Sequence, residues 1–397
     1  MNREKTFDIT VAGHICLDII PRFQSEEKQD VASLFVPGKL ITMKEVVVSS
    51  GGPVSNTGLN AKKLGMKVAF MGKVGDDFFG RGLLSLLKDY DADKGMIIAK
   101  GEHTSYTVVL APAGIDRMFL HSPGANNTYS SADIDYEVVK NSRLFHLGYP
   151  PLMQALYRNE GKELTAIFKK VKQLGVTTSL DMSLPEPNSE AGKVNWEKIL
   201  ENTLPYVDIF LPSVEESAFM IEQKRFYEMK QQAGHKDAVD FYTIEDVEHL
   251  ARRFLQMGTA MVVLKCAHRG SHLRTAGKER LSSITAISPE KLIPWINLCL
   301  WGEAYQAPVF GSATGSGDSF IAGFLTALLS GYDPFTSLRF AHCVGCQNVT
   351  RPDAISGVTN HQETLRLMET YSHLPVQISS PGWKRHASGL WKKTSHE

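Results

Sequence analysis

The sequence predicts an α/β fold in which helices cover both faces of a mainly parallel β-sheet. Short apolar runs at 9–12, 68–71, 144–147 and 261–264 read as buried strands. Amphipathic stretches long enough for helices separate these runs along most of the chain. Strand–helix alternation of this kind indicates crossovers between parallel strands, and crossovers place helices on both faces of the sheet.

The elements follow in order along the chain. Strands are expected at 9–12, 68–71, 144–147, 177–181, 208–212 and 261–264. Helices are expected from about 55, at 78–90, 164–174, around 196, and at 244–257, 318–329 and 334–350.

Two stretches depart from this alternation. Residues 17–48 and 103–121 read as β-hairpins with polar turns. The highly charged residues 222–242 indicate a solvated helix or loop. The apolar side chains of 275–310, among them Trp295 and Trp301, are expected to pack on the core, and the tail from Ser379 is expected to be loosely held.

Composition excludes several classes of protein. The 397 residues hold 43 Lys and Arg against 43 Asp and Glu, a balance that argues against nucleic acid as the main partner. No run reaches the roughly 20 apolar residues of a membrane helix, and the charged N-terminus does not resemble a signal peptide. Five cysteines in so long a chain predict no disulfide framework. We therefore expect a cytoplasmic globular protein.

The most informative segment is Gly315-Ser316-Gly317-Asp318, which leads directly into an apolar helix. Unpaired backbone N–H groups and the helix dipole make such a helix start an anion site. A carboxylate in the first turn can accept the proton of a hydroxyl that attacks the bound anion. The segment therefore predicts phosphoryl transfer to an alcohol, with Asp318 as general base and Gly315, Ser316 and Gly317 as the anion hole.

Two other glycine motifs fit this segment poorly. No Gly-Lys-Ser/Thr follows, so it is not a lysine-bearing P-loop. Ser319 and Phe320 stand where a dinucleotide fingerprint needs its third glycine, and the motif lies late in the chain.

A second glycine turn enters a helix in the N-terminal third. Gly51 and Gly52 allow a ligand to approach the backbone closely. Asn56 follows near the helix start and offers both a donor and an acceptor, which suits a polyol.

The two glycine segments, in this order, resemble the two signatures of the PfkB, or ribokinase-like, carbohydrate kinase family. Further segments match in the expected order: Asp18 in 13–18, Pro-Gly-Ala-Asn at 123–126, Pro-Ser-Val-Glu-Glu at 212–216, and 265–271. The resemblance covers roughly residues 7–360.

The resemblance implies a ribokinase-like three-layer αβα sandwich around a mainly parallel sheet, with a small β lid over the sugar. The main kinase domain would comprise residues 1–16, 49–102 and 122–375. Residues 17–48 and 103–121 would form the lid, and 376–397 a C-terminal tail. A lid would keep water from accepting the phosphoryl group.

The resemblance also implies the roles of individual residues. Asp18, Gly51, Gly52 and Asn56 would bind the acceptor. ATP would bind through the residues Lys265, His268, Gly270, Thr314 and Asn348, with adenine near Asn348 and Ile355. Glu216 would help hold Mg²⁺, through water. A monovalent cation such as K⁺ near 351–358 and a homodimer paired through the lids follow from the same analogy.

The sequence departs from the family pattern at several positions. Ser213 stands where asparagine is usual, Ser316 where alanine is commoner, and Ala267 where glycine is usual. Residues 181–185 lack the Asn and Arg often found in fructose-type members.

Three readings stay open beside a sugar or polyol kinase. A nucleoside kinase of the same fold would phosphorylate nucleosides and not free sugars. A catalytically weak sugar- or nucleotide-binding regulatory protein is supported only by Ser213. A dinucleotide oxidoreductase is the most distant alternative. The sequence does not identify the acceptor or the hydroxyl that is phosphorylated.

Overall fold

A large mixed sheet forms the centre of the molecule in the computed structural model, which describes residues 5–24, 31–34, 36–113, 118–387 and 389–394. The strand order is β14-β15-β13-β12-β11-β10-β9-β8-β1-β4-β5. The seven strands from β11 to β5 run parallel, and β12, β13, β15 and β14 add antiparallel pairs at one end. Its strands are β1 Phe7–Gly13, β4 Val68–Gly75, β5 Met96–Ala99, β8 Ser142–Gly148, β9 Thr177–Leu180, β10 Ile209–Phe210, β11 Met261–Lys265, β12 Ser271–Thr275, β13 Cys299–Gly302, β14 Trp383–Ala387 and β15 Leu390–Lys393.

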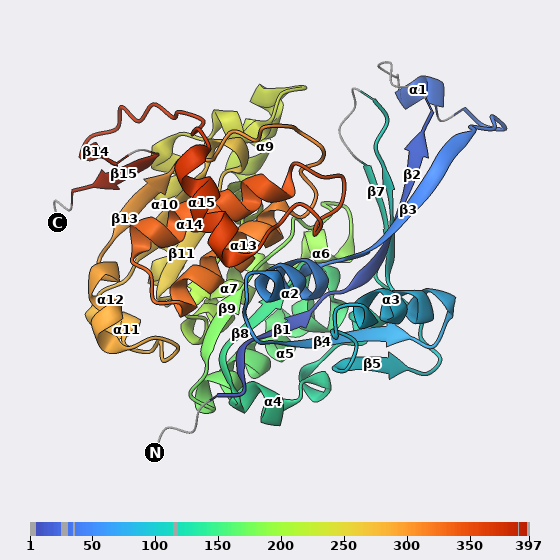
Figure 1. Ribbon diagram of the computed structural model, residues 1–397, viewed down its shortest axis with the longest axis horizontal. Coiled ribbons are helices and arrows are strands. Elements are labelled where there is room, and N and C mark those ends of the chain that lie inside the picture. The colour runs from blue at the N-terminus through green and yellow to red at the C-terminus, as the bar shows by residue number, and fades with distance from the viewer. Residues whose placement is uncertain (1–4, 25–30, 35, 114–117, 388, 395–397) are drawn as a thin grey trace.

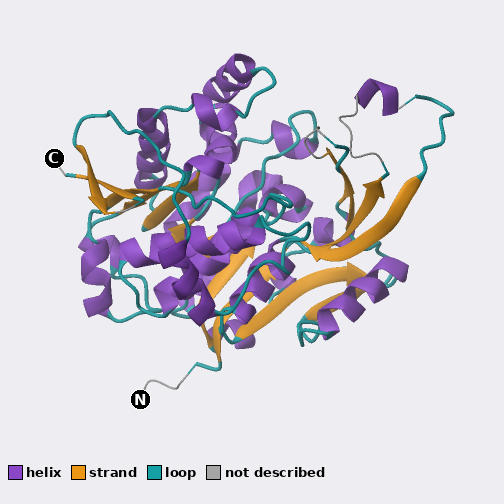
Figure 2. Cartoon of the chain, turned by 45° about the horizontal axis from the view of Figure 1, so that its top comes forward, coloured by secondary structure: helices purple, strands orange, loops and turns teal. Residues whose placement is uncertain are grey.

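Helices cover both faces of this sheet (Figure 2). The longer ones are α2 Pro53–Lys63, α3 Phe78–Lys88, α5 Gln154–Gln173, α7 Trp196–Thr203, α8 Val214–Ile221, α9 Gln223–Ala233, α10 Ile244–Gln256, α13 Ser316–Leu329, α14 Pro334–Asn348 and α15 His361–Thr370. The short ones are α1 Val31–Leu34, α4 Tyr136–Lys140, α6 Glu190–Lys193, α11 Lys278–Leu281 and α12 Pro289–Leu292. The predicted helices and parallel strands are confirmed, and most ends differ by a few residues; α5 begins ten residues before the predicted 164, with a kink at 158–161 inside it.

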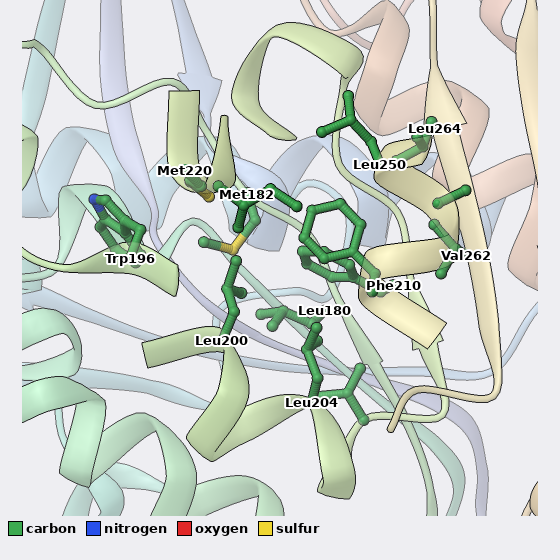
Figure 3. Close-up of a cluster of buried hydrophobic side chains, with 14 of the residues drawn as sticks. Leu180, Met182, Trp196, Leu200, Leu204, Phe210, Met220, Leu250, Val262 and Leu264 are labelled. Atoms are coloured by element: carbon green, nitrogen blue, oxygen red, sulfur yellow. The ribbon is translucent and has the colours of Figure 1, made fainter. Parts of the chain in front are cut away.

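Successive side chains of each strand point to opposite faces of the sheet, so the hydrophobic core has one layer on each face. Phe210 and Val262 point to one face and pack with the helices α5, α7, α8 and α10 (Figure 3). Their neighbours Ile209 and Val263 point to the other face and pack under α13. Because successive strand residues face opposite sides, a strand buried on both faces must be apolar throughout, as the predicted runs are.

A second, four-stranded sheet stands out from one end of the molecule (Figure 1). Its order is β3-β2-β6-β7, with β2 Cys16–Phe23, β3 Met43–Gly51, β6 Tyr106–Leu110 and β7 Met118–Ser122. The pairs β2–β3 and β6–β7 are antiparallel, and a parallel pairing of β2 with β6 joins them. The expected pairing of both hairpins is confirmed, although residues 114–117 between β6 and β7 lie outside the described part of the chain.

The C-terminal tail differs from the expectation. The predicted loosely held tail forms β14 and β15, and β15 pairs with β13 so that the two strands extend the main sheet. Trp391 lies opposite Trp301 in this pairing. The 275–310 segment packs on the core as predicted, with Trp295 and Trp301 fully buried, and it adds β13, which the sequence did not indicate. The highly charged residues 222–242 include α9, and Phe226 and Met229 of this helix are buried. The segment predicted to be solvated therefore also contributes side chains to the core.

Candidate active site

The turn before α13 has the geometry of an anion site. Gly315 is the N-cap of α13 and has a φ of 74°, in the left-handed region that favours glycine. A side chain there would also collide with Ala354, because an added Cβ would lie 2.3 Å from the Ala354 Cβ. No side chain caps the helix start. The Ser316 N–H bonds the Ala313 carbonyl oxygen at 3.2 Å, which leaves the N–H group of Gly317 to an anion.

Asp318 lies in the first turn of α13 and is only 3% exposed. Its Oδ2 accepts a hydrogen bond from the Asn56 Nδ2 at 2.9 Å, and its Oδ1 accepts one from the Tyr149 hydroxyl at 2.6 Å. The Thr57 hydroxyl donates a longer bond of 3.4 Å to Oδ1. Burial raises the pKa of Asp318, while the bonds from Tyr149 and Asn56 and the nearby Lys265 charge oppose that rise.

Asp18 lies on β2 beside the first glycine turn. An added Cβ on Gly51 would lie 2.3 Å from the Asp18 Oδ2, so glycine is required for this close approach. The Cys16 thiol donates to the Asp18 Oδ1 at 3.3 Å. Burial raises the pKa of Asp18 to about 6, so this carboxyl group changes charge near neutral pH.

Lys265 brings a buried cation to the start of α13. Its Nζ lies 2.6 Å from the Asp181 Oδ1, and it would lie 3.8 Å from a Cβ added to Gly317. Burial works to lower the pKa of Lys265, but the carboxylates of Asp181 and Glu216 outweigh it and the net shift is upward. The lysine is therefore held as a cation beside the anion site.

A cavity of about 270 Å³ opens on the other side of this cation. Small residues and rings line it, including Tyr305, Phe310, Phe320 and His342. His342 is held by its Nε2 against the Ser271 hydroxyl at 2.9 Å, and burial lowers its pKa to about 3. A flat, uncharged ring can stack in such a cavity while phosphates reach Lys265 and the α13 start.

The structure brings most of the predicted residues together. Asn56 and Asp318 are hydrogen-bonded although they lie far apart in sequence, and Gly51 contacts Asp18. The residues that line the cavity include the predicted Lys265, His268, Gly270, Ser316 and Gly317.

Three other predicted residues, Asn348, Thr314 and Glu216, do not line the cavity. Asn348 is fully buried and is not among the residues that line the cavity, although Gly345, Cys346 and Val349 of the same segment are. Thr314 also does not line it, and its backbone N–H bonds the Ser312 hydroxyl at 3.1 Å. Glu216 closes a capping box with Ser213, whose N–H donates to the Glu216 Oε2 at 2.6 Å.

Sequence reasoning missed Tyr149, Thr57 and the Asp181–Lys265 ion pair. A usable signal existed for two of them. Tyr149 and Asp181 directly follow the parallel strands β8 and β9, and ligand sites in α/β sheets gather at the carboxyl ends of such strands. Thr57 sits one residue after Asn56 on α2 and carries no comparable signal.

Comparison with known proteins decides the family. A model of the pfkB family of carbohydrate kinases matches residues 8–293 and 303–361. The chain belongs to the pfkB family. Its members are phosphotransferases that act on an alcohol group, so this pfkB protein is a kinase by class.

Several relatives align over most of their length. An uncharacterized sugar kinase of Archaeoglobus fulgidus is 23% identical over 300 residues, covering 76% of this chain and 98% of the relative. The 5-dehydro-2-deoxygluconokinase of Bacillus subtilis is 22% identical over 376 residues, covering 94% and 98%. The structure of Arabidopsis thaliana ribokinase complexed with ribose and ATP superposes with a TM-score of 0.66 at 20% identity, covering 92% and 99%. The predicted ribokinase-like fold is thus confirmed.

Within the described ranges, none of the helices combines the length and apolar character needed to span a bilayer.

Proposed function

We propose that this protein is an ATP-dependent kinase that transfers the γ-phosphoryl group to a hydroxyl of a sugar or related polyol. One observation carries the proposal. The buried Asp318 carboxylate, in the first turn of α13, accepts hydrogen bonds from Asn56 and Tyr149, and the adjacent Gly317 lines the cavity beside Lys265. A base placed between an acceptor and a phosphate site is what transfer to an alcohol requires.

Asp318 acts as the general base. The acceptor oxygen forms a bond to the γ-phosphorus, the bond from that phosphorus to the ADP oxygen breaks, and the acceptor proton moves to Asp318. The proton moves late, because an alcohol is far less acidic than a carboxylic acid. Hydrogen bonds from Asn56 and Tyr149 fix the orientation of the carboxylate during this step.

Groups of the protein stabilise the negative charge of the phosphoryl group during its transfer. The backbone N–H group of Gly317 lies in the first turn of α13, and the Gly315 turn lets the phosphate approach it closely. The Ser316 N–H would have to exchange its bond to the Ala313 carbonyl oxygen for one to the phosphate. Lys265 adds a fixed cation on the nucleotide side. Preorganised donors of this kind stabilise charge without reorganising during the reaction.

ATP fits the cavity that His268 and Gly270 help to line. The Arabidopsis ribokinase with which the chain shares its fold holds ATP and ribose. The adenine contact proposed here is with the cavity rings and the Val349 end of α14, in place of the Asn348 side chain, which does not line the cavity.

Mg²⁺ would neutralise phosphate charge, and Glu216 would hold it through water. Within the described part of the chain, no group of three or more His, Cys, Asp or Glu side chains is arranged to hold a metal ion. A single carboxylate acting through water is compatible with Mg²⁺, because this ion keeps several waters and is bound largely by the nucleotide phosphates. Burial raises the pKa of Glu216, and Lys265 opposes the rise.

The loop 351–358 already holds a cation of the protein. The Lys63 Nζ donates to the carbonyl oxygens of Ile355 at 2.7 Å and Val358 at 3.3 Å. The proposal therefore needs no K⁺ at those two oxygens. The homodimer and the cytoplasmic location implied by the sequence stay predictions.

Replacing Asp318 by asparagine tests the proposed function. An ADP-release assay over pentoses, hexoses, keto sugars and nucleosides first identifies the acceptor. Asp318→Asn should then lower kcat on the order of 10²–10⁴-fold with nucleotide binding retained, because the base is lost. Glu290→Gln, an exposed acid in the first turn of α12, is the matched control and should leave the rate unchanged.

The same screen separates the alternatives. Turnover of nucleosides without free sugars would establish the nucleoside kinase. Background ATPase alone, with every acceptor, would favour the regulatory protein. Near-normal turnover by Asp318→Asn would refute the assigned base.

A further inference from the structure

Two imidazoles lie beside the acceptor side of Asp318. His14 directly follows β1, and His121 is on β7 of the small sheet. Their ring centroids are 5.2 Å apart. The His14 ring also stacks on Tyr149 at 5.9 Å, and the Tyr149 hydroxyl donates to Asp318. The main sheet and the small sheet thus each place one histidine next to the reaction centre.

Contacts join these rings to Asp18. The Thr107 hydroxyl lies 3.0 Å from the His121 Nδ1 and 3.6 Å from the Cys16 Sγ, and the Cys16 thiol donates to the Asp18 Oδ1. An added Cβ on Gly52 would lie 2.6 Å from the His14 Nδ1, so the second glycine of the turn makes room for the ring. The histidines therefore belong to the region where Asp18, Gly51 and Gly52 are expected to bind the acceptor.

Among the described residues, several polar atoms of this region are buried without a hydrogen-bond partner. They are both ring nitrogens of His14, the Nε2 of His121 and the Oδ1 of Asn56. His14 is only 2% exposed. Leaving a buried polar atom unpaired costs about 1–3 kcal/mol, so a ligand that pairs these atoms is favoured.

The charge states of the groups in this region indicate which class of ligand it binds. Burial lowers the pKa of His14 well below its usual range, with His121 adding to the effect, and burial lowers the pKa of His121 to about 4. Both rings are therefore neutral near pH 7, and each can donate one hydrogen bond and accept another. Among the described residues, no lysine or arginine is a cause of the pKa shifts of Asp18, His14 or His121. Two carboxylates are linked to these rings through other side chains, Asp18 through Thr107 and Cys16, and Asp318 through Tyr149.

We propose that His14 and His121 select the acceptor by hydrogen-bonding its hydroxyl groups, and that the acceptor is an uncharged sugar or polyol. A sugar acid or sugar phosphate would place its negative charge beside Asp18 and Asp318, where Lys265, the cation that acts on Asp318, is already paired with Asp181. Desolvating an unpaired charge is costly, and like charges at short range repel, so the site discriminates against such acceptors. This inference rests on the proposed function and gives it a substrate class.

Pairs of acceptors that differ in charge test directly whether the acceptor is uncharged. Neutral sugars are compared with their charged counterparts, namely ribose with ribonate, glucose with gluconate, and fructose with fructose 6-phosphate. The neutral member of the best pair should show kcat/KM at least about 100-fold higher, measured by ADP release. A preference for the acid or phosphate overturns the proposal.

Variants test the two residues. His14→Gln and His121→Gln should each raise the acceptor KM about tenfold or more while the ATP KM changes less than about twofold. His121→Arg should reduce the preference for the neutral sugar about tenfold, because it supplies the missing cation. His249→Ala, an exposed histidine on α10, is the control. An unchanged acceptor KM in both glutamine variants, with melting temperatures retained, overturns the role.

NMR of the histidine rings provides a readout that does not depend on turnover. In the free protein, ¹⁵N shifts of His14 and His121 should report neutral rings from pH 7 down to pH 5. Protonated rings at pH 7 overturn the proposal even if the acceptor is unknown. If no sugar or nucleoside is phosphorylated, the proposed function fails, while this measurement still decides the charge of the site.

Discussion

Asp318 receives hydrogen bonds from two segments that lie far from it in the sequence. Asn56 and Thr57 reach it from α2, and Tyr149 reaches it from the end of β8. Each bond favours the ionised carboxylate and works against the effect of burial on its pKa. A buried base with these partners is oriented by its neighbours and protected from water.

Tyr149→Phe should weaken the base mainly at low pH. Loss of a hydrogen bond to a charged group is worth about 1.5–3 kcal/mol, so the pKa of Asp318 should rise and kcat should fall most at the acid end of the pH profile. The acid limb of the kcat–pH profile should move to higher pH. Tyr136→Phe, whose hydroxyl bonds Ser131 instead, should leave the profile in place.

Asp18→Asn should stabilise the protein while impairing acceptor binding. The folded-state pKa of Asp18, about 6, lies above its usual value of 3.8, so ionising it costs stability as the pH rises through 6. A shift of that size corresponds to about 2–3 kcal/mol. Urea unfolding should therefore show Asp18→Asn more stable than the parent at pH 7.5 and nearly equal at pH 4. Asp89→Asn, at the exposed end of α3, should show no such difference.

Helix α2 connects the two halves of the candidate site. The Asn60 Nδ2 bonds the Ser319 hydroxyl at 2.9 Å and the Ala354 carbonyl oxygen at 3.0 Å. Lys63, one turn later, bonds the carbonyl oxygens of Ile355 and Val358. Since Ala354 packs against Gly315, α2 fixes the loop that shapes the start of α13.

Lys63→Met should loosen this loop. Two carbonyl oxygens would lose their donor, at a cost of about 1–3 kcal/mol, and backbone amides of 353–358 should exchange hydrogen faster. The nucleotide KM should rise in parallel, because the Gly315 turn loses its support. Lys62→Met, the neighbouring lysine on α2, is the control. Unchanged exchange in 353–358 would contradict the role of Lys63.

The C-terminal strands β14 and β15 are expected to contribute to the stability of the whole molecule. They lie at the end of the main sheet opposite to β5 (Figure 1). Glu303 is 1% exposed and accepts bonds from Arg385 and from the Trp391 Nε1. Glu248 is 3% exposed and accepts bonds from Lys393 and from the Trp383 Nε1. The strands thus neutralise two buried carboxylates.

Ending the chain at Gln377 should destabilise the whole protein. The truncation leaves Glu248 and Glu303 buried without their cations, and removing one partner of a buried pair typically costs 3–5 kcal/mol. A drop of more than about 3 kcal/mol in the free energy of unfolding is expected from urea titration. A chain ending at Thr394 is the control. Equal stability of both chains would mean that the strands pack without contributing to the fold.

Local patterns in the sequence determined the parallel strands, the helices and the glycine turns. Strand burial shows as continuous apolar runs, and a helix start shows as glycines followed by an apolar helix, so neighbouring residues suffice. They predicted Asp318 at the start of α13, and the order of the motifs predicted Asn56 and Asp18 in one site.

Only the tertiary structure decided which distant groups meet. The contacts of Tyr149 with Asp318, Asp181 with Lys265 and His14 with His121 join segments that are separate in the sequence. From the sequence alone, the charged residues of β14 and β15 are expected to face solvent. In the structure, Arg385 pairs with the buried Glu303 and Lys393 pairs with the buried Glu248. Backbone preference and periodicity act between near neighbours, whereas pairing of charges and rings depends on how the sheet orders its strands.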